Sequence, residues 1–277
     1  MNANTRLSEL RGILYEPPTP QSWAALCAHL DAFPQVELAL ALDYAEQRLD
    51  AWPDDLRTAP PSWHHDLFAS RPQPRLRLCR FLDLGTLGGG DQAARVLASH
   101  PEARHLRRLN FANNRLTAQG AALLASSPHL TGLTRLDLSL NDLGDDGAQA
   151  IAASPTLQHL HTLEMLRCNL HTNAARDLST SPHLAGLRTL NLWNNPLGPE
   201  GAAALASSTT LTALTHLDLG TCLVGDVGAA AFAHANRLNN LERLNLSRND
   251  IGPDTRRLLN DAPTLSRTRI NLAGNRA

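Results

Sequence analysis

Residues 133–143 read LTRLDLSLNDL, and this stretch decides the fold. Leucines occupy its first, fourth, sixth and eleventh positions, and an asparagine occupies the ninth. The same template starts again every 27 residues, at Leu106, Leu133, Leu160, Leu187, Leu214 and Leu241. Partial copies lie before it, at Cys79, and after it, at Ile270. A fixed period of this length predicts a solenoid, in which each repeat packs on its neighbours.

The second half of each copy has the features of a helix. A turn such as residues 143–147 (LGDDG) contains acidic residues or proline at the predicted start of the helix, and these residues suit the unpaired N–H groups there. Small residues then recur where adjacent helices would pack, at Ala94, Ala121, Ala148, Ala175, Ala202 and Ala229. Each repeat is therefore predicted to be a strand, a turn, a helix and a return.

With this template, and with Cys168 and Cys222 replacing asparagine at the ninth position, the chain resembles the ribonuclease-inhibitor class of leucine-rich-repeat proteins. The resemblance implies an α/β leucine-rich-repeat solenoid over residues 79–277, with about seven repeats and a terminal strand. A parallel β-sheet would line the concave face and α-helices the convex face. The two cysteines would bond to backbone in a ladder, as the asparagines do. We also expect a bacterial source.

Residues 1–78 do not follow the period. Apolar residues at helical spacing predict helices around Leu7–Leu14, Trp23–Phe33 and Leu38–Trp52. The first repeat of a solenoid has one face without a neighbour, so we expect this segment to be an α-helical N-terminal cap. A second binding surface on the cap is the alternative. At the other end the last strand has no closing helix, which leaves an edge that either frays, with Arg267, Arg269 and Arg276 discouraging association, or pairs with a second copy.

Composition narrows the function. The formal net charge is −1 and all 25 basic residues are arginine, so we expect neither nucleic acid as a partner nor phosphate or Schiff-base chemistry that depends on lysine. No continuous apolar run approaches the length of a membrane span, and the N-terminus lacks the pattern of a secretory signal. No His, Cys or carboxylate spacing indicates a metal site, and we expect no cofactor. Four cysteines without a disulfide framework favour the cytoplasm.

Side chains that leave the buried pattern predict the binding face. The fifth position forms an acidic and amide column that includes Asp137, Glu164 and Asn191, beside a third-position column that is partly basic and includes Arg135. Solvation of an exposed sheet is the alternative explanation of these charges. At the seventh and eighth positions, which are otherwise small or polar, Leu140, Leu166 and Trp193 come from three consecutive repeats. Together with Arg135, Arg167 and Asn194 they have the composition of a protein-binding hot spot.

We therefore predict a non-catalytic module that binds a partner protein through the concave face, as a regulator, inhibitor or scaffold. Two alternatives stay open. A GTPase-activating type of accessory protein would use Arg115 on a strand-to-helix loop. An enzyme would place its site in the N-terminal region, around Trp63, His64, His65 and Asp66.

Overall fold

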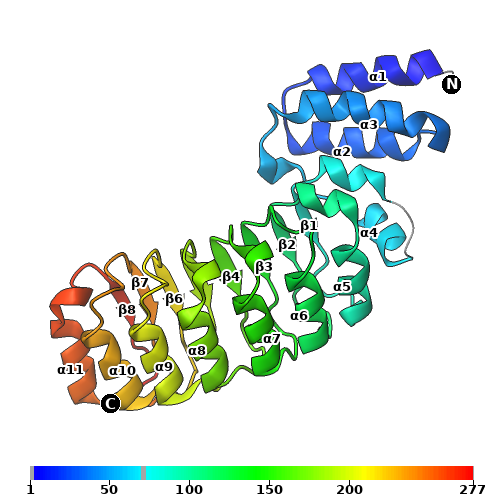
Figure 1. Ribbon diagram of the computed structural model, residues 1–277. Helices are drawn as coiled ribbons and strands as arrows, with labels where there is room; N and C mark the ends of the chain where they lie inside the picture. Colours follow the sequence, from blue (N-terminus) through cyan, green and yellow to red (C-terminus); the bar gives the residue numbers. More distant parts are fainter. Residues whose placement is uncertain (1–2, 70–72, 277) are drawn as a thin grey trace.

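The structure is a computed structural model, and it describes residues 3–69 and 73–276, without the side chains of residues 65–68. Repeats with strands on one side and helices on the other extend from a group of N-terminal helices (Figure 1). This arrangement confirms the predicted α/β leucine-rich-repeat solenoid.

One parallel sheet runs through the solenoid, with its eight strands in sequence order. The strands are β1 (Phe81–Asp83), β2 (Arg108–Asn110), β3 (Arg135–Asp137), β4 (Thr162–Glu164), β5 (Thr189–Asn191), β6 (His216–Asp218), β7 (Arg243–Asn245) and β8 (Arg269–Asn271). Each strand pairs in register with the residues at the same template positions of the next, for example Leu109 with Leu136. The middle leucine of β1 to β7 is buried and its two neighbours are more exposed, because successive side chains of a strand point to opposite faces.

Helices cover the other side of the sheet (Figure 1). They are α5 (Gly90–Ala98), α6 (Ala118–Ala125), α7 (Gly144–Ala152), α8 (Thr172–Thr180), α9 (Gly198–Ala206), α10 (Gly225–Ala233) and α11 (Pro253–Asp261). Each packs on the next, and the alanines at the predicted contact positions from Ala94 to Ala229 are fully buried. Proline-led 3-10 turns return the chain to the sheet in several repeats: η3 (Pro101–His105), η4 (Pro155–Leu157), η5 (Pro182–Leu184) and η6 (Pro263–Leu265).

The ninth template position forms a hydrogen-bonded ladder beside the sheet. Asn195 is fully buried; its Oδ1 accepts from the backbone N–H groups of Cys168 and Leu170, at 2.8 and 3.1 Å. Its Nδ2 donates to the carbonyl oxygens of Met165 and Leu192, at 2.8 and 2.9 Å. The Cys168 thiol donates to the Leu138 carbonyl oxygen at 3.2 Å, so the cysteine takes the donor part of the same role.

The N-terminal segment begins with three helices, α1 (Ala3–Tyr15), α2 (Pro20–Asp31) and α3 (Gln35–Leu49). Their mutual core contains Leu10, Leu26, Leu30 and Leu42, each almost fully buried. The short η1 (Asp54–Leu56), helix α4 (Pro61–Phe68) and η2 (Pro74–Leu78) then lead to β1.

Residues 57–59 continue the sheet beyond β1. Thr58 forms a parallel bridge with Phe81, the Arg57 carbonyl oxygen accepts from the N–H groups of Arg80 and Phe81, and the Ala59 N–H donates to Phe81. Helix α4 packs against α5, as each later helix packs on its neighbour. Residues 57–59 and helix α4 therefore lie against the first repeat much as each repeat lies against the next, an arrangement that the irregular sequence of this segment did not predict.

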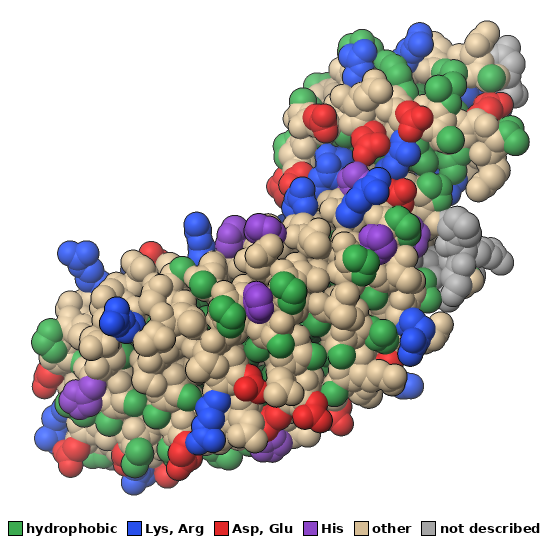
Figure 2. All heavy atoms as spheres, viewed as in Figure 1, with side chains coloured by type: hydrophobic (Ala, Val, Ile, Leu, Met, Phe, Trp, Pro, Cys, Tyr) green, Lys and Arg blue, Asp and Glu red, His purple; other side chains and the backbone are tan. Residues whose placement is uncertain are grey.

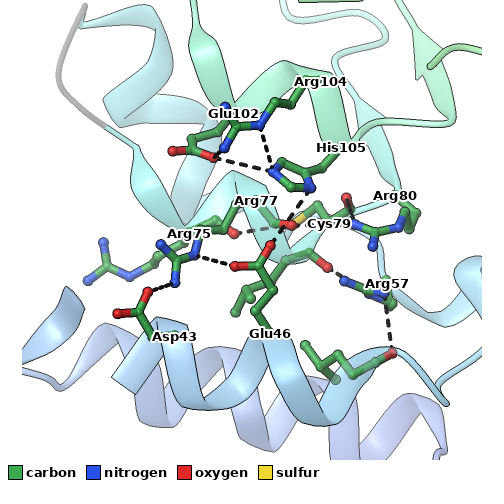
Figure 3. A network of polar contacts seen from close by, with 12 residues as sticks. Asp43, Glu46, Arg57, Arg75, Arg77, Cys79, Arg80, Glu102, Arg104 and His105 are labelled. Carbon is green, nitrogen blue, oxygen red and sulfur yellow. Dashed lines mark hydrogen bonds and ion pairs between the residues drawn. The ribbon is translucent and has the colours of Figure 1, made fainter. Parts of the chain in front are cut away.

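Charged side chains join the cap to the first repeats (Figure 3). Arg77 on η2 pairs with Asp43 and with Glu46 of α3, and Glu46 also lies 3.9 Å from His105 of η3. Arg57 is 2% exposed and donates through Nε to the Leu78 carbonyl oxygen at 2.7 Å. Burial lowers the pKa of the Arg57 guanidinium to about 10. Basic side chains are prominent at this junction on the molecular surface (Figure 2).

Candidate functional site

The exposed side of the sheet, called here the sheet face, consists of the third, fifth and seventh template positions. The third and fifth residues flank the buried fourth residue on each strand, so their side chains point away from the core. The seventh residue follows just beyond the strand. Because adjacent parallel strands lie about 4.8 Å apart, each template position forms a continuous column across the repeats.

The fifth-position column is used largely by the chain itself. Its carboxylate or amide oxygen accepts from the backbone N–H two residues later, which closes a turn at the end of the strand. This bond occurs at Asp83, Asn110, Asp137, Asn191, Asp218, Asn245 and Asn271, with distances from 2.9 to 3.1 Å. Asp137 and Asn191, predicted as partner-binding residues, therefore have a structural role in addition to any contact with a partner.

Glu164 departs from this column. Its longer side chain does not close the turn, and the Leu166 N–H instead lies 3.4 Å from the Ser139 hydroxyl oxygen. The Glu164 carboxylate accepts from Arg135 at 2.5 Å, which joins two of the predicted site residues. Burial, followed by the nearby negative charge of Asp137, raises the pKa of Glu164.

Leu140 and Arg167, both at the eighth position, line a groove of about 600 Å³ on the rim where strands turn toward helices. Arg115 lines the same groove. Leu140 is 42% exposed and has a φ of 60°, in the left-handed region that bulky side chains seldom occupy. The structure thus brings two predicted site residues together with the arginine considered for a GTPase-activating role.

Trp193 lies elsewhere on the sheet face. It lines a hollow of about 440 Å³ with Ser247, Arg248, Asn271, Ala273 and Gly274. The indole reaches across the neighbouring repeat: a Cβ built on Gly220 would lie 2.6 Å from Trp193 Cδ1. The Asn194 N–H donates to the Gly220 carbonyl oxygen at 2.8 Å, so this turn is also fixed to its neighbour.

The predicted apolar cluster is consequently divided between two places. Leu140 belongs to the rim groove and Trp193 to the hollow over the last strands, and neither depression contains all three apolar residues. Leu166, half-buried, shares the seventh-position column with Trp193 and lies one repeat before it.

Another hollow, which the sequence did not single out as a site, lies over β5–β8. Its volume is about 510 Å³, and third-position and fifth-position side chains of these strands line it. The third position contributes Thr189, His216, Arg243 and Arg269. The basic residues of the third-position column were a sequence signal for this hollow, but the prediction of the binding site relied on the unusual apolar residues instead.

The N-terminal residues considered for an enzyme site have structural surroundings where they are described. Trp63 is 1% exposed, and its indole Nε1 donates to Asp31 at 2.7 Å. His64 is buried; burial lowers its pKa, and its Nε2 has no hydrogen-bond partner among the described residues. The side chains of His65 and Asp66 lie outside the described residues.

The cysteines have no reactive surroundings. All four are free and buried. Burial raises the pKa of the Cys168 and Cys222 thiols to about 12, which keeps them protonated at neutral pH. Among the described side chains, those of residues 3–64, 69 and 73–276, no group of three or more His, Cys, Asp and Glu residues is arranged to hold a metal ion. None of the helices in residues 3–69 and 73–276 has the length and apolar character that a membrane span requires.

Comparison with known proteins supports the repeat assignment. Residues 102–125, 129–152, 185–206, 210–233 and 237–254 match a family model described as Leucine Rich repeat. Solved structures similar to this chain include an internalin (inlF) from Listeria monocytogenes str. 4b F2365, at 17% sequence identity and a TM-score of 0.42. The match covers 73% of this chain and 63% of the internalin chain, so this chain spans less than two thirds of that protein. No curated protein matches the sequence.

Proposed function

We propose that this protein is a non-catalytic, ribonuclease-inhibitor-like interaction module that binds a partner protein through its sheet face. The observation that carries the proposal is the placement of Trp193. Its indole is held over Gly220 by close packing, yet the side chain remains half-exposed and opens onto a hollow. A large aromatic side chain that is already ordered loses little entropy when a partner covers it.

The other predicted residues divide between contact and support. Leu140 and Arg167 extend the surface onto the rim, whereas Asp137 and Asn191 fix the turns that carry the seventh-position residues. Asn194 follows Trp193 in the chain, and Leu166 lies one repeat before it in the same column. Arg135 and Glu164 pair with each other. Four free thiols support a location in the reducing cytoplasm.

The test is affinity capture from the source organism with the wild-type chain and a Trp193→Ala variant. Val227→Ala is the matched control, because Val227 is an apolar side chain, 75% exposed, at the start of α10 and away from the sheet. We expect the tryptophan variant to lose the partner and the control to retain it, with equal thermal melts. Equal capture by both variants contradicts binding through Trp193.

Arg115 supports a second candidate function. Its side chain is exposed in the rim groove beside Leu140 and Arg167 and makes no ion pair among the described residues. If the partner is a GTPase, Arg115→Ala removes stimulation of GTP hydrolysis without removing binding.

Association of two copies through the edge of β8 is a further prediction, which the molar mass in solution tests.

A further inference from the structure

Three consecutive strands present cationic or titratable side chains at the same template position. His216 on β6, Arg243 on β7 and Arg269 on β8 are register partners, so their columns place them about 4.8 Å apart from strand to strand. All three line the hollow of about 510 Å³, and both arginines are exposed. The two arginines therefore form a positive wall about 5 Å long, and His216 lies beside it on the next strand.

The two arginines differ from the other third-position arginines of the sheet face, Arg108 and Arg135, in having no partner among the described residues. Arg135 pairs with Glu164, Arg108 lies 5.0 Å from the centroid of the Phe81 ring, and Arg276 pairs with Asp226 and Asp250. Neither Arg243 nor Arg269 makes an ion pair or a side-chain hydrogen bond there. Their ten N–H donors are therefore free for a ligand.

The acidic residue that lines this hollow already accepts two hydrogen bonds. Asp218 lines the same hollow, and its Oδ1 accepts from the Gly220 N–H and from Asn245 Nδ2, both at 2.9 Å. Arg248 adds a further cation in the adjacent hollow, which Trp193 also lines. Asn271 lines both hollows, so the positive wall and the indole belong to one continuous surface.

The charge reverses farther along the sheet face. Asp137 on β3 and Glu164 on β4 lie side by side, with Arg135 as the cation that neutralises one of them. A long polyanion such as a nucleic acid, laid along the sheet face from β8, would meet these carboxylates. A short acidic segment ends before them, and carboxylates match the fork of a guanidinium.

We propose that the β6–β8 end of the sheet face binds a short acidic segment of the partner protein, with Arg243 and Arg269 as the carboxylate-binding residues. Arg248 adds positive charge at one side, and the imidazole of His216 lies at the other. This inference rests on the proposed function and names the chemistry of the partner at that site.

The experiment uses the full chain and a hexaglutamate peptide with blocked ends, titrated at low salt and followed by calorimetry. The Arg243→Ala/Arg269→Ala variant should bind the peptide about 10-fold more weakly than the wild type does. A matched double variant, Arg95→Ala/Arg237→Ala, removes two exposed arginines away from the hollow and should bind as the wild type does. Arg243→Glu/Arg269→Glu should lose hexaglutamate and acquire binding of hexalysine.

Three results overturn the inference. The wild type does not bind hexaglutamate, or the Arg243→Ala/Arg269→Ala variant binds it as tightly as the wild type does. The third is that the wild type binds hexathymidylate as tightly as the peptide. These failures are distinguishable from failure of the proposed function. A partner that is captured by the wild type and lost with Trp193→Ala leaves protein binding intact even when the acidic peptide does not bind.

Discussion

Asp137 and Glu164 lie side by side at the same register position of β3 and β4. The other two aspartates of this column face an asparagine instead: Asn110 Nδ2 donates to Asp83 at 2.8 Å, and Asn245 Nδ2 donates to Asp218 at 2.9 Å. Glu164 has no such donor to offer, so two carboxylates are neighbours here, which occurs nowhere else in the column.

Replacing Glu164 with asparagine should stabilise the fold. The new amide can donate to Asp137, and its oxygen can accept from the Leu166 N–H, as the other asparagines of the column do. We expect the free energy of unfolding to rise by about 0.5–1.5 kcal/mol, which is the usual net contribution of one hydrogen bond. Urea denaturation measures it, and a loss of stability would show that the pair with Arg135 matters more.

Replacing Glu164 with glutamine should change the pH dependence of stability. The pKa of Glu164 is raised in the folded state, so the folded chain binds this proton more tightly than the unfolded chain does. Its contribution therefore falls as the pH rises from the ordinary glutamate pKa through the raised value. As the pH rises across this window, the wild type should lose stability relative to the Glu164→Gln variant. A difference in the free energy of unfolding that does not change with pH would contradict the raised pKa of Glu164.

Leu140 occupies a conformation that suits asparagine better. Its φ of 60° recurs at the eighth position of other repeats, where Asn113 and Asn194 have values of 52° and 56°. Leu140→Asn should raise the free energy of unfolding by about 0.5–1 kcal/mol, because a branched side chain is strained there. It should also weaken capture of a partner that contacts the rim groove.

The reciprocal substitution, Asn194→Leu, provides the control in the same column. It should lower stability by a similar amount, since it introduces the strain that Leu140 carries. Thermal melts of both variants test this pair. If Leu140→Asn is destabilising, the packing of the leucine outweighs its backbone strain.

The two residue types of the ninth-position ladder should differ in their cost of removal. Asn195→Ala leaves two buried N–H groups and the Met165 carbonyl oxygen without their partner, so we expect a loss of roughly 3 kcal/mol or more. The thiol of Cys222 only donates, chiefly to the Leu192 carbonyl oxygen at 3.1 Å. Cys222→Ala should cost about 1 kcal/mol. Equal losses in urea denaturation would contradict the different roles.

Two glycines test how closely the helices of the solenoid pack. A Cβ on Gly228 of α10 would lie 2.9 Å from the Pro199 carbonyl oxygen and 3.0 Å from the Ala202 Cβ. Gly228→Ala should therefore lower stability by about 1–3 kcal/mol. In α1, nothing lies within 4 Å of a Cβ on Gly12, so Gly12→Ala should raise stability by about 0.5–1 kcal/mol. Differential scanning calorimetry separates the two outcomes.

Much of the fold follows from the period of the sequence, because equal spacing forces equal positions into register. The pairing of Leu109 with Leu136 was predictable on this basis. The hydrogen bond of Cys168 was expected from the resemblance to the ribonuclease-inhibitor class. The strand-like pairing of Arg57 with Arg80 was not, since it uses backbone groups that any residue possesses. Only the fold of the surrounding cap brings those groups to the edge of β1.

The candidate site was less accessible to sequence reasoning. Template numbering places Leu140 and Trp193 within two repeats of each other, but it does not reveal that the left-handed backbone directs the eighth position to the rim. The positive wall at Arg243 and Arg269 depends on which charges are paired. Arg135 and Arg243 occupy the same column, and only the structure shows that the first pairs with a carboxylate and that the second pairs with none in the part of the chain that is described.

The turn-closing bonds of the fifth column also bear on how such a protein acquires a new target. A substitution at Asp218 or Asn191 disturbs the backbone of its own repeat, whereas one at Thr189 or Arg243 changes only what the surface presents. Specificity can therefore evolve, or be redesigned, through the third and seventh columns while the fifth is held constant. The repeat separates the residues that maintain it from the residues that are free to vary.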